Sequence, residues 1–254
     1  MTDPKPAVLR RDRHGFRLRG DQMTRIETFS DAAFAFAVSL LVIAADAGPA
    51  SFDQLTDALL GVPAFALAFA LIMSFWVGHW SWSRRFGLED AASILLSCVL
   101  IFLVLVFVYP LRYLAALFTY YFSGGRLSPT ASINPDQLHD IFAIYGAGYV
   151  AMALIIIALN AHALRLRDQL DLDRVEVFIA RSEMRAWTIL ASVGALSVTL
   201  ALALPVSNLM LPGWIYMLLP VLMPLNGTRT NRRLESIRAE VRAPGAGRSR
   251  PDRP

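Results

Sequence analysis

The charged residues of this chain are segregated from its apolar residues, and this separation limits what it can fold into. Charged residues make up 17% of the sequence and gather at the two ends and in short connections, whereas hydrophobic residues make up 56%. A soluble domain carries about 25% charged residues. A charge at the centre of a bilayer is costly, and helices satisfy their own backbone hydrogen bonds there. The pattern therefore predicts an all-α integral membrane protein.

The apolar runs are long enough for six membrane-spanning helices. A span needs about 20 residues, and the first run, residues 32–45, is too short unless its helix begins near Arg25. Thr24 and Glu27 have the spacing of a helix-capping pair, which supports that start. The last uncharged stretch is too long for one span, and its prolines divide it into two. The expected spans lie near residues 25–45, 57–84, 90–112, 141–161, 186–204 and 213–226.

The segments between and around these spans are polar or basic. Residues 112–140 contain glycine and proline and are expected to form a loop outside the membrane, with a short aromatic helix at the interface. Residues 164–185 are charged, helical in pattern, and expected to pack at the membrane surface. Residues 1–20 are expected to be a disordered basic tail, and residues 227–254 a basic cytoplasmic tail that is disordered near its end. The six-helix domain then covers residues 21–226.

The distribution of basic residues predicts which side of the membrane each end faces. Of the 24 lysine and arginine residues, 22 lie in the two ends and in the connections that follow the second and fourth spans. Only Arg112 and Arg126 lie in the other connections. Cytoplasmic segments carry an excess of basic residues. Both termini are therefore expected to be cytoplasmic, which requires an even number of spans and agrees with six.

Signatures of enzymes and metal sites are missing from the sequence. It contains no H-E-x-x-H, C-x-x-C, G-x-S-x-G or P-loop motif, and its four histidines do not have the spacing of metal ligands. We therefore expect no catalytic residue, no metal and no cofactor. The basic charge is interpreted as an orientation signal and not as a nucleic-acid surface. Gly146 and Gly148 resemble part of a dinucleotide fingerprint but are interpreted as small residues at a helix–helix contact.

Polar residues at the start of the first span form the most informative cluster. Arg25, Phe29, Ser30 and Asp31 precede a run of small and apolar residues. Ionisable groups in a membrane helix are by default a hint of function. Ser30 and Asp31 are suited to hydrogen bonds with neighbouring helices, and Arg25 to an ion pair with Asp31 or another carboxylate. The residue types leave two interpretations open: a functional site, or a cluster that only locks the inner ends of helices together.

The same segment resembles the first-helix signature of the transmembrane protein 175 family, which comprises the endolysosomal potassium channel of animals and its bacterial relatives. The family pattern is an arginine, three residues, Phe-Ser-Asp, and a small and apolar stretch with Thr-Leu-Leu. In this chain Arg25, Phe29-Ser30-Asp31 and Ser39-Leu40-Leu41 fall at matching spacing.

Two further segments support the resemblance. The second span contains Phe75-Trp76 and His79, like the family's Phe-Trp-x-x-His, and the third contains Tyr109-Pro110 after a leucine-rich run. The matches cover residues 22–112, and the last three spans agree in number and placement only. The resemblance implies that Trp76 and His79 pack against the Phe-Ser-Asp segment. The alternative for these two side chains is an interfacial aromatic belt.

The resemblance implies a channel assembled from four copies of the chain. Bacterial members carry one six-helix unit and form homotetramers around a pore lined by the first helix, with rings of apolar side chains as the constriction and a hydroxyl layer nearby. Mapped onto this chain, the constriction falls on Phe36, Leu40 and Ile43, and the hydroxyl layer on Ser39. One helical face can present all four. Periodicity alone does not select that face, because nearly every residue of this span is apolar.

Two departures from the family pattern concern the pore. Phe36 stands where the family usually has isoleucine, and Ser39 stands where it has threonine, whose rotamer is more restricted.

The expected function is a potassium-conducting cation channel of undetermined selectivity, multi-pass in the bacterial inner membrane, with the lipid bilayer and its own copies as partners. The alternatives are a secondary transporter, which tends to show paired inverted halves, and a proton or cation leak pathway. A membrane-embedded enzyme would need deeply placed polar residues, which the apolar runs almost lack.

Overall fold

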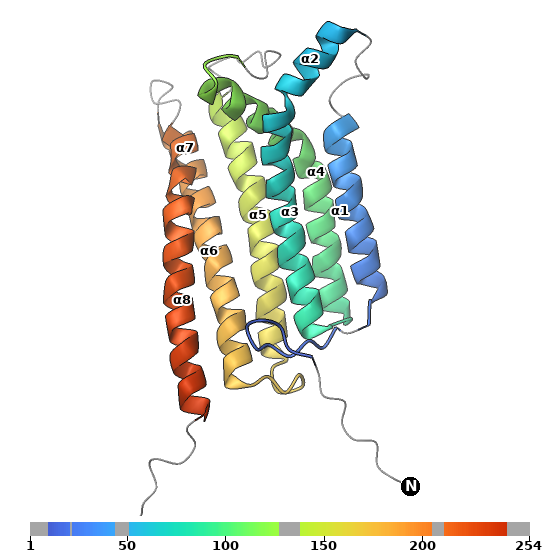
Figure 1. The fold of residues 1–254 in the computed structure, drawn as a ribbon, viewed down its shortest axis with the longest axis vertical. Coiled ribbons are helices and arrows are strands. Elements are labelled where there is room, and N and C mark those ends of the chain that lie inside the picture. The colour runs from blue at the N-terminus through green and yellow to red at the C-terminus, as the bar shows by residue number, and fades with distance from the viewer. Residues whose placement is uncertain (1–9, 21, 44–50, 127–137, 205–210, 243–254) are drawn as a thin grey trace, which may run out of the picture.

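Long helices that run side by side make up the chain in the computed structural model (Figure 1). The structure describes residues 10–20, 22–43, 51–126, 138–204 and 211–242. The elements are α1 (Arg25–Ile43), α2 (Phe52–Leu60), α3 (Val62–Phe86), α4 (Ala91–Phe122), α5 (Leu138–Arg165), α6 (Arg174–Ala203), α7 (Leu211–Trp214), the 3-10 helix η3 (Ile215–Leu218) and α8 (Leu219–Arg242). By length and composition, four helices can cross a membrane: α3, α4, α5 from Asp140 onwards, and α6. The chain is therefore an all-α membrane protein, as its composition predicts.

The core of the bundle is centred on α5, which makes its most extensive contacts with α6 and α4. Small residues permit this close packing. A Cβ atom added to Gly146 would lie 2.5 Å from Val198 Cγ2, and one added to Gly148 would lie 2.6 Å from Phe107 Cδ2. Distances this short leave no room for a larger side chain. The interpretation of the two glycines as helix-contact residues is confirmed.

The prediction that residues 112–140 form a loop is wrong for the first part of that stretch. α4 runs without interruption over Ala91–Phe122 and contains Pro110. A proline removes one backbone hydrogen bond and kinks a helix, but side chains beyond it are buried in the bundle and hold the following turns in place: Leu111, Leu114 and Leu117. In Figure 1 the last turns of α4 lie across the end of the bundle. Residues 127–137 lie outside the described residues.

The charged segment 164–185 also differs from its prediction, because most of it belongs to α6. The side chain of Asp173 accepts a hydrogen bond from the backbone N–H of Glu176 at 2.8 Å, and the Glu176 carboxylate accepts one from the backbone N–H of Asp173 at 3.0 Å. This reciprocal capping starts a helix. Residues 174–185 are therefore the first turns of a span-length helix and not a separate surface element.

The predicted break between the last two spans is confirmed. α6 ends at Ala203, where Leu204 takes up an extended conformation, and the next described helix begins at Leu211. α7, η3 and α8 then follow one another without a gap. Residues 227–242 continue α8 as a helix to Arg242, and residues 243–254 lie outside the described part of the chain.

Residues 10–20, which we call the N-terminal hook, pack against one end of the bundle. Phe16 is fully buried, and its ring meets that of Phe86 at the end of α3 with centroids 5.3 Å apart. The backbone N–H of Gly20 donates to the carbonyl of Arg84 at 3.1 Å. The prediction of a disordered tail is therefore wrong for the hook, while residues 1–9 lie outside the described residues.

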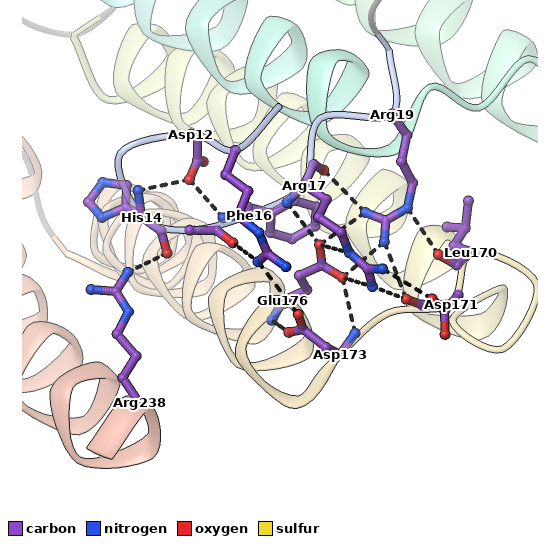
Figure 2. A network of polar contacts seen from close by, with 12 residues as sticks. Asp12, His14, Phe16, Arg17, Arg19, Leu170, Asp171, Asp173, Glu176 and Arg238 are labelled. Atoms are coloured by element: carbon purple, nitrogen blue, oxygen red, sulfur yellow. Dashed lines mark hydrogen bonds and ion pairs between the residues drawn. The ribbon is translucent and has the colours of Figure 1, made fainter. Parts of the chain in front are cut away.

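A buried carboxylate on α6 holds the hook in place (Figure 2). Glu176 is 0% exposed and pairs with both Arg17 and Arg19 at 2.9 Å. The two arginines also bind the turn between α5 and α6, through Asp171 and the carbonyl of Leu170. The hydrogen bonds that Arg17 donates to the Glu176 carboxylate raise the pKa of Arg17 above its usual range. Breaking a buried pair of this kind costs about 3–5 kcal/mol, because the remaining charge is left without a partner.

Candidate functional site

α1 begins where a threonine side chain caps its first turn. Thr24 Oγ1 accepts a hydrogen bond from the backbone N–H of Glu27 at 3.1 Å. Such a bond satisfies one of the backbone donors that a helix start leaves unpaired. The predicted start at Arg25 is confirmed. The helix ends at Ile43, and residues 44–50 lie outside the described part of the chain.

One face of α1 is buried in the bundle and the opposite face is exposed. The helix packs against α4 and α3. The buried face repeats every three or four residues: Glu27, Ser30, Phe34, Ala37 and Leu41. The exposed face carries Ser39 and two aromatic rings, of Phe29 at 57% exposed and Phe36 at 55% exposed. Both rings therefore remain more than half exposed in a single subunit.

The Asp31 carboxylate binds α3 rather than Arg25. The indole Nε1–H of Trp76 donates to Asp31 Oδ1 at 2.8 Å, and Trp76 stacks on Trp80 with ring centroids 6.2 Å apart. Arg25 is exposed and forms no ion pair within the described residues. Arg25 and Asp31 are six residues apart, which places them on different sides of a helix with 3.6 residues per turn.

His79 is buried on the side of α3 that faces α4. Its Nε2 lies 2.9 Å from Ser97 Oγ, and its ring lies 5.7 Å from that of Trp82. Trp76 thus contacts the Phe-Ser-Asp segment as predicted, whereas the polar contact of His79 is with α4. Ser97 was not identified from the sequence. Its only signal there is a hydroxyl in an apolar run, four residues after Ser93.

Two buried polar atoms of α1 have no hydrogen-bond partner among the described residues. They are Glu27 Oε2 and Ser30 Oγ, on side chains that are 4% and 0% exposed as whole residues. A buried unpaired group costs about 1–3 kcal/mol. Native proteins depart from full pairing mainly at functional or strained sites. The unpaired atoms lie on the same turns of α1 as Asp31, at the end of the helix that the hook precedes.

The residues mapped to the constriction and the hydroxyl layer differ in how exposed they are. Phe36 and Ser39 are exposed, and Ser39 Oγ donates its proton to the carbonyl of Ala35 at 3.1 Å. The lone pairs of that hydroxyl oxygen remain available to accept a bond or to face a cation. Leu40 is half-buried and packs against the core. Ile43 is the last residue of α1, and its side chain lies outside the described part of the structure.

The cluster at the start of α1 therefore separates into two groups. Asp31 joins α1 to α3 through Trp76, while Ser30 is buried on the face of α1 that packs into the bundle. Phe29 and Arg25 face away from the bundle. The locking interpretation therefore fits Asp31, whereas Arg25 and Phe29 make no such contact with another helix within the described residues.

The proteins to which this chain is similar are named as potassium channels. The family model described as "Endosomal/lysosomal potassium channel TMEM175" matches residues 25–110. A protein of Marivirga tractuosa named "Potassium channel" is 34% identical over 227 residues, covering 86% of this chain and 92% of that protein.

Two solved structures resemble the fold. One is a crystal structure of a variant of the potassium channel MtTMEM175 in complex with a nanobody–MBP fusion; it has a TM-score of 0.75 at 33% identity and covers 85% of this chain and 97% of that chain. The other is a lysosomal potassium-selective channel TMEM175 homologue from Chamaesiphon minutus, with a TM-score of 0.52 at 21% identity over 82% and 97% of the two chains. At that identity the second likeness concerns the fold alone.

The bond between Asp31 and Trp76 generates a stability prediction. Trp76→Phe keeps an aromatic ring but removes the indole donor, so the free energy of unfolding should fall by about 1.5–3 kcal/mol, the value of a hydrogen bond to a charged group. Trp80→Phe is the matched control, because Trp80 is 43% exposed and its indole makes no hydrogen bond to a described residue. Melting of both purified variants in detergent measures the difference. Equal stability of the two variants would contradict a role for this bond.

Proposed function

This chain belongs to the TMEM175 family and is a potassium channel, and we propose that four copies enclose a pore lined by the exposed face of α1. The family and its named relatives are ion channels, so the chain is not an enzyme. The observation that carries the proposal is the two-sided burial of α1. Phe34 on one side is 2% exposed, whereas Phe36, two residues later, is 55% exposed.

The exposed face has the chemistry of a constriction that excludes water and then admits a cation. Phe36 and, from the edge, Leu40 supply large apolar groups, and we place Ile43 in the same ring system. Narrow apolar rings gate by dewetting, with a barrier that depends on side-chain size and polarity. Ser39 adds four hydroxyl oxygens around the axis. Because each donates its proton to the Ala35 carbonyl, the oxygen side of the hydroxyl is the side left to face a dehydrating potassium ion.

We further propose six spans in the bacterial inner membrane, the additional two being α1 and the segment formed by α7, η3 and the start of α8. The 19 residues of α1 reach about 28 Å at 1.5 Å per residue, close to the roughly 30 Å thickness of the hydrocarbon core. The contact of Arg238 on α8 with the His14 carbonyl in the hook supports an even number of spans, because it brings both ends of the described chain to one end of the bundle. The excess of basic residues assigns that end to the cytoplasm.

The first test of this arrangement is topology. A reporter fused after Pro254 should be cytoplasmic, and one inserted at Gly125, beyond the end of α4, should be periplasmic. A reporter at each site that reads the same compartment would rule out six spans with both termini inside.

Assembly is the second test. One α1 helix cannot surround an axis, so the purified protein should have four times the subunit mass of 28.1 kDa, after correction for bound detergent. Mass photometry or native mass spectrometry measures this. A monomer that still conducts ions would refute the proposed pore.

The third test separates pore residues from packing residues by matched substitutions. Phe36→Ala should raise potassium flux into liposomes, because a smaller side chain widens the ring. Phe34→Ala makes the same change on the buried face and should lower stability by about 3–5 kcal/mol without raising flux. Leu40→Ala and Leu41→Ala form a second pair with the same expectation.

Flux of potassium, sodium and protons is measured for each variant beside its melting temperature. If Phe36→Ala and Phe34→Ala change flux equally, the exposed face of α1 does not line the pore. Parallel measurement of the three ions also shows whether a proton or general cation leak describes the pathway better than a potassium channel.

A further inference from the structure

We propose that a pocket between the N-terminal hook and α8 binds a phosphate-bearing anion. The pocket has a volume of about 370 Å3 and is lined by Arg11, Asp12, Arg13, Gly15, Val175 and Arg238. Three of these six residues are arginines, which come from the hook and from α8. This site lies outside α1, so the inference goes beyond the proposed conduction pathway and does not depend on it.

Two of the three guanidinium groups have no carboxylate partner within the described residues. Arg13 Nε donates to His14 Nε2 at 3.1 Å, and one terminal nitrogen of Arg238 donates to the carbonyl of His14. Neither arginine forms an ion pair with a described acidic residue. A guanidinium carries five N–H donors, so most donors of both groups remain available. Figure 2 shows Arg238 reaching towards His14 from α8.

The acidic residues near the pocket are already committed to other contacts. Asp12 Oδ1 accepts the backbone N–H groups of His14 and Phe16 at 2.8 and 2.9 Å, and its Oδ2 accepts Arg85 Nε at 3.3 Å. Asp173 caps α6 and lies 3.7 Å from Arg11, at the outer limit of an ion pair. The pocket is therefore left with an excess of positive charge that the described chain does not neutralise.

Burial is the main influence on the pKa of His14. Its burial, reinforced by the charges of Arg13, Arg85 and Arg238 and opposed by Asp12, lowers its pKa below the usual value. A neutral imidazole can accept the bond from Arg13 through Nε2, whereas a protonated one cannot. His14 therefore stays uncharged at neutral pH and contributes no charge of either sign to the pocket.

The chemistry of the pocket selects the class of ligand. Guanidinium groups bind phosphate oxygens with short, charge-assisted and often bidentate hydrogen bonds. The pocket volume falls within the range of about 300–1,000 Å3 that is typical of small-molecule sites. A diphosphate or a phosphate monoester bearing two charges matches the two unpaired guanidinium groups. Such a group is carried both by soluble metabolites and by the headgroup of a phosphatidic acid.

The experiment titrates the purified full-length protein with inorganic pyrophosphate by calorimetry at constant ionic strength. Arg13→Gln should weaken binding about ten-fold or more, the loss of at least one charge-assisted hydrogen bond. Arg233→Gln is the matched control, because Arg233 is exposed on α8, and its position five residues before Arg238 places it on another side of the helix. Binding should weaken as salt rises.

A second arm measures melting of the protein in phosphatidylcholine nanodiscs with and without phosphatidic acid. Pyrophosphate binding that depends on Arg13 but not on Arg233 supports the site and a soluble source. Stabilisation by phosphatidic acid with that same dependence supports the site and a lipid source. If neither probe binds, or if the two variants bind alike, the proposal is overturned.

A third variant guards against misfolding of Arg13→Gln. Val175→Glu keeps all three arginines but places a carboxylate in the pocket, so it should also lose pyrophosphate binding, while melting without ligand reports whether each variant is folded. A folded Val175→Glu protein that binds like the wild type would likewise overturn the site. None of these readouts measures potassium flux, so their failure leaves the channel proposal untouched.

Discussion

Two hydrogen bonds between polar side chains tie three helices of the chain together in surroundings that are otherwise largely apolar. Asp31 on α1 takes its hydrogen bond from Trp76 on α3, and His79 on α3 bonds with Ser97 on α4. Each bond joins two neighbouring helices. A small shift of one helix along the other would lengthen the bond and break it. The register of α1, α3 and α4 follows from these contacts as much as from their apolar packing. In apolar surroundings a polar side chain needs a partner on another helix, so these few polar side chains favour one arrangement of α1, α3 and α4.

Features that depend on local sequence were predictable, and features that depend on distant partners were not. The start of α1 follows from Thr24, whose side chain caps the next turn, and the end of α6 follows from the prolines after it. The loop prediction for residues 112–140 took Arg112 as the end of the third apolar run, because a charge is costly inside a membrane. The helix nevertheless continues to Phe122, with Leu111, Leu114 and Leu117 buried, and burial depends on which other helices pack against α4. A charged residue at the end of an apolar run therefore does not by itself mark the end of the helix.

The hook and the exposed face of α1 show more clearly that local sequence does not reveal contacts with distant parts of the chain. Residues 10–20 have the arginine-rich composition of a disordered tail, but Arg17 meets Glu176, which is 159 positions away in the chain. The capping spacing of Asp173 and Glu176 is visible in the sequence, yet nothing local reveals that the carboxylate will be buried by the N-terminus. On α1, only Ser39 is polar between Ala32 and Ile43, so no periodic pattern could select one face of that stretch. The distinction between Phe34 and Phe36 exists only once α3 and α4 are packed against the helix.

The positive charges of the arginines at one end of the bundle have more than one effect on the protein. In the proposed topology their number keeps that end in the cytoplasm, and two of them neutralise a buried carboxylate. Arg19 also contacts the turn between α5 and α6, so the hook is tied to several helices immediately before the chain enters α1. The start of α1 is thus held on one side by the bond to Trp76 and on the other by the hook. A charge added or removed at the hook would act on the start of α1 through a chain segment only a few residues long. If α1 lines the pore as proposed, the end of the bundle that carries the hook is a place where the position of α1 can be set.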